Sequence, residues 1–274
     1  TTDDNARALL YLSLLPEGAR DEGLVRTYLA FLLHMQKEDG RFRNGLTLDG
    51  RFEDEGEAED PTGRAVLALA AAQRLPPPYA GPAREALLRA LPALEGFTSL
   101  RGRAYALLGL LALPKEPFLE AAEALGEGLL RAFREAEPAW PYPGPLTYAN
   151  HRPVEALYAY GLAFRRQEAV ALARRALAFL KEHYFTPGEE GLFFDPVGNR
   201  FMARGRDKPL FDQQPIEAKC ALLAHLRFRE RVLAEVAFLW FHGGNRLRAP
   251  LVDAFGPMDG LTPHGPNQNR GAEA

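Results

Sequence analysis

Two kinds of helical segment alternate along this chain, and that alternation is the strongest constraint on its fold. Residues 65–72, 104–113 and 155–163 are apolar on nearly all sides, whereas the segments 116–136 and 168–184 carry charged faces. A helix that is apolar all round must be buried all round, while an amphipathic helix covers a surface. Alternation of the two predicts an α/α toroid, in which inner helices ring an axis and outer helices pack over them.

The hydrophobic period predicts an all-α domain spanning residues 1–274, with an irregular tail over 243–274. The expected helices are 4–15, 22–36, 62–75, 82–95, 102–113, 116–136, 153–165, 168–184, 214–227 and 229–242. A small β-hairpin is expected near 191–203. A helical solenoid or an irregular bundle is the alternative, but no repeat of about 34–45 residues recurs. These helices give five pairs, and Gly271–Ala274 reads as the start of a truncated sixth, so a partner chain or residues beyond these would complete the ring.

Polar residues gather at the amino ends of the apolar helices. Inner helices of a toroid run in the same direction, so their amino ends meet at one mouth of the ring. Helix capping is the competing explanation, and a cap contributes about 1 kcal/mol. Capping needs only one acceptor, whereas each cluster holds several polar groups, including Arg, Gln and His. The clusters are Asp3, Asp4, Asn5 and Arg7; Glu59, Asp60 and Arg64; Asn150, His151, Arg152 and Glu155; Asp212, Gln213, Gln214 and Glu217; and Asn267 to Glu273.

The loops before these helices add flat rings and amides, notably Asn44, Trp140 and Tyr148. Aromatic rings beside carboxylates, amides and arginines suit a sugar, whose hydroxyls form hydrogen bonds with such groups. We therefore expect an oligosaccharide or glycan as the ligand.

Composition excludes several classes of protein. The formal net charge of −3 argues against nucleic acid as a partner. No apolar run is long enough for a membrane span. Cys220 is the only cysteine, so an internal disulfide, a Cys-rich zinc site and a CxxC pair are excluded. Phosphate-binding glycine motifs are absent, and the acidic residues Glu53 to Glu55 fit a solvated loop, so no cofactor and no metal are expected. We expect a cytoplasmic location.

Several strings resemble a bacterial family related to the six-hairpin (α/α toroid) glycosidases. They are Thr2–Leu9, Phe42–Asn44, Glu59-Asp60-x-x-Gly63-Arg64, Phe211–Glu217 and Asp259–Pro263 with Asn267 and Gly271–Glu273. The Phe-Asp-Gln-Gln-Pro-Ile-Glu string is the most specific of these. Members of the family occur fused to, or beside, glycosyltransferases, and the resemblance implies the toroid fold and a possible glycosyltransferase partner. The string from Gln36 to Phe42 is also similar to motifs of toroidal terpene cyclases, but the Asp-rich metal motifs expected there are missing.

The leading hypothesis is hydrolysis of a glycosidic bond by two carboxylates, one protonated and one ionised. Asp60 and Asp212 are the first candidates for the acid and the base. Asp4, Glu59 and Glu217 are the second choices. The expected substrate-binding residues are Asp3, Asn5, Arg7, Asn44, Arg64, Trp140, Tyr148, His151, Arg152, Glu155, Gln213, Gln214 and Asn267. Two alternatives stay open: a sugar epimerase or isomerase that uses His151, and a non-catalytic module that binds glycan or docks onto a glycosyltransferase.

Overall fold

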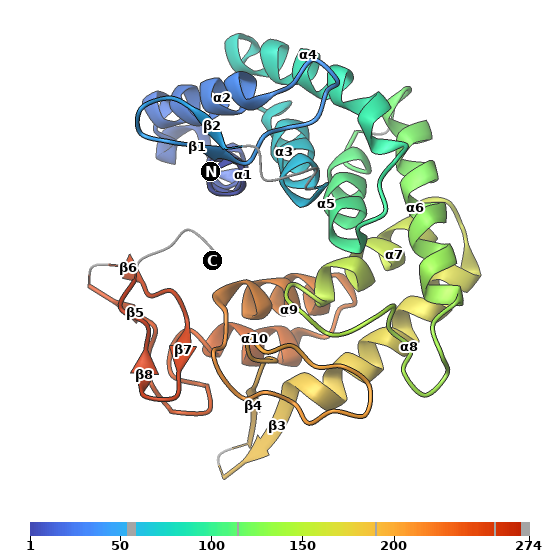
Figure 1. The fold of residues 1–274 in the computed structure, drawn as a ribbon, viewed down its shortest axis with the longest axis vertical. Coiled ribbons are helices and arrows are strands. Elements are labelled where there is room, and N and C mark those ends of the chain that lie inside the picture. Colours follow the sequence, from blue (N-terminus) through green and yellow to red (C-terminus); the bar gives the residue numbers. More distant parts are fainter. Residues whose placement is uncertain (54–58, 114, 190, 255, 270–274) are drawn as a thin grey trace. The chain divides into compact units, whose positions relative to one another are not determined.

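A computed structural model describes residues 1–53, 59–113, 115–189, 191–254 and 256–269. The chain forms two compact units. Unit 1 comprises Thr1–Leu129 and Ala163–Arg165, and unit 2 comprises Leu130–Leu162 and Arg166–Ala274. The described residues contain ten α-helices, which confirms the expected number, and the helical ends lie within a few residues of the expected ones (Figure 1).

Unit 1 holds the first helices of the chain, with α3 at its centre. The helices are α1 (Thr2–Leu14), α2 (Glu22–Met35), α3 (Glu59–Ala72), α4 (Pro77–Leu94), α5 (Leu100–Leu110) and α6 (Phe118–Arg134), whose last residues belong to unit 2. Helix α3 packs against α1, α4 and α5. Every residue of α3 from Pro61 to Ala72 is buried except Leu67. The apolar segment is therefore an inner helix, as its composition predicted.

Two glycines let α3 and α5 approach closely. A Cβ atom at Gly63 would lie 2.5 Å from the backbone oxygen of Gly102, and one at Gly109 would lie 2.8 Å from the Cα atom of Leu67. No side chain fits in such a space, so glycine is required for this packing. The close contact brings the amino ends of α3 and α5 together.

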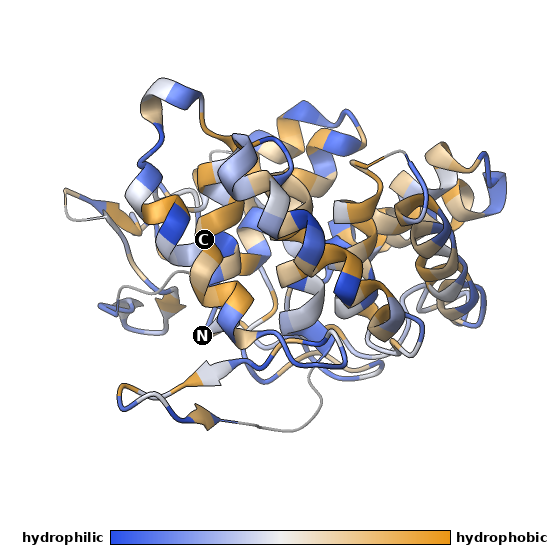
Figure 2. Ribbon diagram, turned by 90° about the horizontal axis from the view of Figure 1, so that it is seen from above, coloured by the Kyte–Doolittle hydropathy of each residue, from blue (hydrophilic) through white to orange (hydrophobic). Residues whose placement is uncertain are grey.

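Unit 2 contains α7 (His151–Ala163), α8 (Gln167–Tyr184), α9 (Pro215–Arg227) and α10 (Arg231–Leu239). Helix α7 is buried from His151 to Gly161, which matches its apolar composition. Helix α9 begins with Pro215 at its first position, where the missing N–H has no partner to lose. Helices of mixed polarity recur in the chain, with blue and orange residues on one ribbon (Figure 2).

Short antiparallel hairpins complete the structure. They pair β1 (Gly45–Leu46) with β2 (Phe52–Glu53), β3 (Phe185–Gly188) with β4 (Gly191–Phe194), β5 (Val252–Asp253) with β6 (Gly256–Pro257), and β7 (Leu261–Thr262) with β8 (Gly265–Pro266). The hairpin expected near 191–203 is half wrong. Its first strand pairs with β3, which precedes it in the chain, and Met202 forms a bridge with Leu146. The suggested helix start at Gly271–Ala274 lies outside the described residues.

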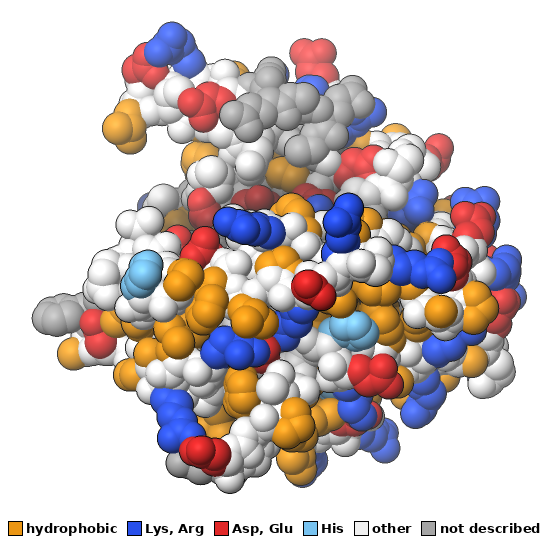
Figure 3. All heavy atoms as spheres, turned by 60° about the horizontal axis from the view of Figure 1, so that its bottom comes forward, with side chains coloured by type: hydrophobic (Ala, Val, Ile, Leu, Met, Phe, Trp, Pro, Cys, Tyr) orange, Lys and Arg blue, Asp and Glu red, His pale blue; other side chains and the backbone are white. Residues whose placement is uncertain are grey.

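No helix in the described ranges combines the length and apolarity that a bilayer crossing requires. Large hydrophobic side chains nevertheless reach the surface at several places, including Tyr11, Leu162, Leu226 and Val232. Figure 3 shows one face on which such side chains lie between basic ones.

Candidate functional site

The first polar cluster lies in unit 1, where the amino ends of α1 and α3 meet. Arg64 Nε lies 3.1 Å from Asp3 Oδ1, so these two residues, far apart in sequence, form an ion pair. The Arg64 side chain is almost completely buried and its guanidinium carbon lies 4.5 Å from the centre of the Tyr105 ring. A cation over an aromatic face is stabilised by the ring quadrupole. Residues from α1, α3 and α5 thus share one site.

Asp60, on the first turn of α3, has two donors from the start of α5. Its Oδ1 atom accepts a hydrogen bond from Ser99 Oγ at 2.7 Å, and its Oδ2 atom accepts one from Arg101 Nε at 2.7 Å. Ser99 also caps α5 by accepting from the backbone N–H of Gly102. These contacts fix the carboxylate in place and suit its ionised form.

Asp3 is a largely buried carboxylate of this cluster. Burial raises the pKa of Asp3, against the opposing charges of Arg64 and Arg7, and the nearby charge of Asp60 raises it further. A carboxyl group with a raised pKa beside one that is held by donors is the arrangement that acid–base chemistry uses.

The remaining candidates of unit 1 divide between this cluster and local contacts. Asp4 pairs with Arg7 Nη1 at 2.7 Å, one turn along α1. The Asn44 side-chain oxygen accepts a hydrogen bond from the backbone N–H of Asp3 at 3.3 Å. Asn5 donates to the Thr1 carbonyl at the start of α1. Glu59 accepts from the backbone N–H groups of Thr98 and Ser99, so it joins α3 to the loop before α5.

The second polar cluster lies in unit 2 and is buried. Asn150 donates to Tyr184 Oη at 2.8 Å and to Glu217 Oε1 at 3.3 Å, which joins the starts of α7 and α9 to the end of α8. Burial and the charge of Glu217 raise the pKa of the Tyr184 phenol well above its ordinary value. Within this unit the starts of α7 and α9 are thus joined by a buried polar contact, while their expected role at a sugar-binding mouth stays a prediction.

His151 lies entirely inside unit 2. Its side chain has no exposed surface, and its ring is 4.9 Å from Tyr184 and 5.7 Å from His225. Neither ring nitrogen has a hydrogen-bond partner among the residues that the structure describes. Burial, together with His225, lowers the pKa of His151 well below its ordinary value. In this arrangement the ring presents no atom to a sugar, so nothing here supports its expected role as a substrate contact or as an epimerase base.

Arg152 and Glu155 form a buried ion pair on α7. Arg152 Nη1 lies 2.6 Å from Glu155 Oε2, and Arg227 Nε lies 3.0 Å from Glu155 Oε1. The two arginines balance a carboxylate that would be very costly to bury alone. Glu155 therefore has a structural explanation that does not need a substrate.

Asp195 is the centre of an ion cluster that holds the loops before α9. It is fully buried and contacts Arg246 at 2.6 and 3.0 Å, Lys208 at 2.8 Å and Gln213 at 2.9 Å. Burial opposes ionisation, but the hydrogen bond from Arg246 and the charge of Lys208 lower the pKa of Asp195 overall. Gln213 also accepts a hydrogen bond from Trp240 Nε1 at 3.0 Å. Gln213 thus connects Asp195 with Trp240 and is buried.

The other candidates of unit 2 lie nearer the surface. Asp212 is exposed, and Gln214 donates to Asn199 Oδ1 at 3.1 Å. Trp140 donates to the Gly144 carbonyl and lines a cavity of about 630 Å³ together with Tyr142 and Arg204. Tyr148 packs on the buried cluster of Ala149, Ile216 and Cys220. Asn267 lies in the β7–β8 region, and the last members of its cluster, residues 270–273, are outside the described residues.

Sequence reasoning missed the contribution of α5. Ser99, Arg101 and Tyr105 complete the unit 1 cluster, but the expected helix began at residue 102, which left Arg101 in a loop. The signal was present, because Ser99 is a favoured N-cap residue and precedes two arginines at the start of an apolar segment. Lys208 and Arg246 were also missed, and no local pattern in the sequence connects them with Asp195.

The described residues hold no group of three or more His, Cys, Asp or Glu side chains arranged to bind a metal ion.

Comparison with known proteins identifies the fold. No protein-family model matches the chain, and no curated protein matches its sequence. Among solved structures, the chain is similar to an unsaturated glucuronyl hydrolase specific for heparin, with a TM-score of 0.58 and 11% sequence identity. The match covers 94% of this chain and 70% of that enzyme. At this identity the likeness shows the fold alone: the chain has the all-α, six-hairpin glycosidase-like toroid fold that its alternating helices predicted.

Proposed function

We propose that this protein hydrolyses a glycosidic bond in an oligosaccharide, and that the cluster of Asp3, Asp60, Arg64 and Arg101 in unit 1 is its reaction centre. The observation that carries the proposal is the difference between the two carboxyl groups. Burial raises the pKa of Asp3, whereas Asp60 is held by Ser99 and Arg101. Glycoside hydrolysis needs one protonated carboxylic acid and one ionised carboxylate.

The chemistry assigns a role to each group. Asp3, whose pKa is raised by burial, donates a proton to the leaving oxygen as the bond to the sugar breaks. Asp60, positioned by Ser99 and Arg101, accepts a proton from the attacking water. Arg64 stays positively charged beside both steps and balances the negative charge that remains on Asp3 after it donates its proton. We favour inversion, which places the two carboxyl groups about 6.5–9.5 Å apart.

The structural neighbour supports this proposal, because it is a hydrolase that acts on a sugar. Its name makes an unsaturated uronyl disaccharide from heparin a sensible first substrate to test. The earlier prediction that Asp212 acts together with Asp60 stays a prediction, as do the substrate-binding roles of the unit 2 residues.

The test replaces the two carboxylates separately. Asp3→Asn and Asp60→Asn are each expected to lower kcat/KM about 10²–10⁴-fold, because proton transfer by a positioned group contributes that much. Asp39→Asn, in an exposed loop of the same unit, is the matched control and is expected to keep full activity. Release of reducing sugar from a panel of neutral and uronate-containing oligosaccharides measures the effect. Full turnover by both Asn variants on a substrate that the wild type cleaves would refute the assignment.

A non-catalytic glycan-binding module, or one that docks onto a glycosyltransferase, is the competing function and rests on the family resemblance. It predicts thermal stabilisation by a sugar without any cleavage. A product of unchanged mass would instead indicate the epimerase alternative.

A further inference from the structure

A separate pocket in unit 2 carries an arrangement of charges that the proposed hydrolysis does not use. It has a volume of about 690 Å³ and is formed at the carboxyl end of α9, the start of the loop to α10, and the facing sides of α7 and α8. Its lining residues are Glu155, Tyr158, Leu162, Arg174, Leu223, Leu226, Arg227, Phe228 and Arg229. We call it the arginine pocket. Its volume lies within the range of small-molecule binding sites.

Three guanidinium groups and one carboxylate line the arginine pocket. Glu155 is buried and already has two partners, Arg152 at 2.6 Å and Arg227 at 3.0 Å. Arg227 uses its Nε atom for that ion pair, and its side chain is nearly half exposed. The carboxyl end of α9 contributes about half a negative charge, which is small beside three guanidinium groups. The pocket is therefore positively charged.

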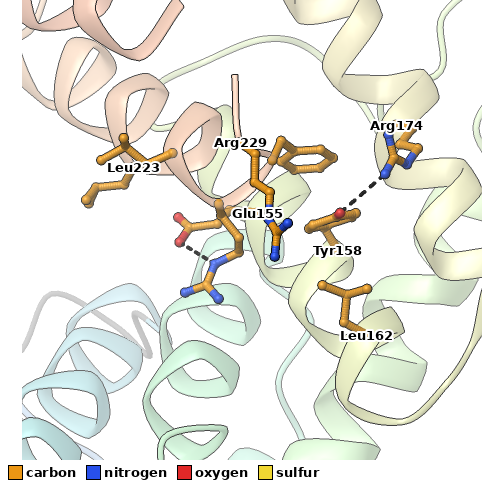
Figure 4. Close-up of a pocket in the computed structure, with 9 residues that line it drawn as sticks. Glu155, Tyr158, Leu162, Arg174, Leu223 and Arg229 are labelled. Atoms are coloured by element: carbon orange, nitrogen blue, oxygen red, sulfur yellow. Dashed lines mark hydrogen bonds and ion pairs between the residues drawn. The ribbon is translucent and has the colours of Figure 1, made fainter. Parts of the chain in front are cut away.

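Arg229 is the most informative of the three arginines. Across the described part of the chain, its side chain has no hydrogen bond or ion pair, although it extends between Glu155 and Tyr158 (Figure 4). Its φ angle is 64°, in the left-handed region that a bulky side chain rarely adopts. The backbone thus directs an unpaired cation into the pocket.

Arg174 approaches from α8 and is also available to a ligand. Its Nη2 atom lies 3.4 Å from Tyr158 Oη, which is a long hydrogen bond, and its guanidinium carbon is 5.5 Å from the Tyr158 ring centre. Tyr158 in turn stacks on Phe228 with ring centres 3.9 Å apart. This stack is buried and gives the pocket a fixed wall.

Apolar side chains lie beside these cations. Leu162, Leu223 and Leu226 are 56%, 37% and 50% exposed, so each leaves apolar surface in water. Covering such surface with an apolar group is favourable. The pocket therefore offers a hydrophobic surface next to a cluster of hydrogen-bond donors.

We propose that the arginine pocket binds a small organic anion, a phosphate or a carboxylate attached to an apolar body. The anionic group contacts Arg174, Arg227 and Arg229, since guanidinium groups form paired hydrogen bonds with planar or tetrahedral oxyanions. The apolar body covers the exposed leucines. The site is distinct from the proposed reaction centre, because it lies in unit 2 and uses the carboxyl end of α9.

Isothermal titration calorimetry on the full chain tests the proposal. The probes are phenyl phosphate, benzoate, inorganic phosphate and benzyl alcohol. An organic anion is expected to bind with a dissociation constant below about 1 mM, inorganic phosphate more weakly, and benzyl alcohol not measurably. Phenyl phosphate against benzoate decides which anion the pocket prefers. Added salt is expected to weaken binding.

Substitutions identify the site. Arg229→Gln and Arg174→Gln are each expected to weaken binding of the preferred anion about tenfold or more, because each removes a charge-assisted contact. Arg175→Gln is the matched control, since Arg175 is the exposed neighbour of Arg174 on α8 and does not line the pocket. Circular dichroism checks that the variants are folded. Failure of both anions to bind, or equal binding by the wild type and both Gln variants, would overturn the proposal. Neither result depends on whether the protein cleaves a sugar.

Discussion

The polar clusters of the two units have the same sequence signature but different physical states. Each begins where a loop enters an apolar inner helix, at α1 and α3 in unit 1 and at α7 and α9 in unit 2. In unit 1, Asp3 and Asp60 remain partly accessible, with 23% and 14% of their side chains exposed. In unit 2, Asn150, His151 and Glu217 are buried. Exposure, and not residue type, separates a candidate reaction site from an internal network.

The two units also differ in how many hydrogen-bond donors surround their carboxylates. Asp195 has contacts from Arg246, Lys208 and Gln213, and the pKa of this buried carboxyl is lowered despite the cost of burial. Asp3 has its ion pair with Arg64, and its pKa is raised. A carboxylate held by several strong donors has little tendency to take up a proton, whereas an under-stabilised one does. We therefore expect substitutions in unit 2 to affect mainly stability, and those in unit 1 mainly activity.

Asp195→Ala should have the largest effect on stability. The substitution leaves Lys208 and Arg246 close together without their shared anion, and breaking a buried ion pair from one side costs about 3–5 kcal/mol. We expect a loss of that order in the free energy of unfolding, measured by urea denaturation at pH 7. Asp207→Ala, an exposed carboxylate in the same loop, is the control and should change it by less than about 0.5 kcal/mol. A loss below about 1 kcal/mol for Asp195→Ala would mean that the cluster does not hold unit 2 together.

Gly63→Ala tests the packing that assembles the unit 1 cluster. The added Cβ atom would lie 2.5 Å from the Gly102 backbone oxygen, so α3 and α5 must move apart. Overpacking of this kind costs about 1–3 kcal/mol, and it also shifts Asp60 away from Arg101. We expect lower stability together with lower activity. Gly96→Ala, where a Cβ atom meets nothing within 4 Å, should change neither property. Reduced stability with unchanged activity would separate the α3–α5 contact from the reaction centre.

Most of the helical fold could be predicted from the sequence, because burial follows directly from composition in helices such as α3 and α7. The segments Ala65–Ala72 and Glu155–Ala163 have almost no polar face, so only an inner position suits them. The hairpin partner of β4 could not be predicted in the same way. Phe185–Gly188 continues from α8, and its pairing depends on a turn rather than on a hydrophobic period.

The site was predictable only in part. The cluster of Asp3 and Arg64 follows from the rule that inner helices share a direction, and the structure places them 3.1 Å apart. The burial of His151 could not be foreseen, since a histidine at a helix start is polar in any sequence pattern. Arg246 reaches Asp195 across 51 residues of chain, and only the tertiary structure makes that contact.

His151→Phe tests the internal character of the unit 2 cluster through pH. The folded-state pKa of His151 is lowered by burial and by His225, so the neutral ring is the form that folding favours. The unfolded chain takes up the proton as pH falls below about 6.5, and wild-type stability is lost from that pH downward. Phe keeps the ring shape without a titratable group. At pH 5.5 we expect the variant to gain about 1 kcal/mol relative to its difference from wild type at pH 7.5.

Urea denaturation at the two pH values measures this gain. The exposed His264 provides the control, because His264→Gln should leave the pH dependence of stability as it is in the wild type. Parallel pH profiles for the wild type and His151→Phe would show that the ring takes up its proton as readily in the folded as in the unfolded chain, which contradicts its burial in unit 2.

Asp3→Asn should produce the smallest change in stability, and its sign is diagnostic. Because the folded-state pKa of Asp3 is raised, its contribution to stability is fully present below the unfolded pKa of about 3.9 and is lost as pH rises through the folded value. Near neutral pH the ionised group is therefore a net cost, which Asn removes. We expect Asp3→Asn to be slightly more stable than wild type at pH 7, by less than about 1 kcal/mol, while activity falls sharply. Asp39→Asn should raise neither quantity. A clear loss of stability at pH 7 would instead show that the Asp3–Arg64 ion pair stabilises the fold. The polar cluster of unit 1 would then be structural, as the cluster of unit 2 is.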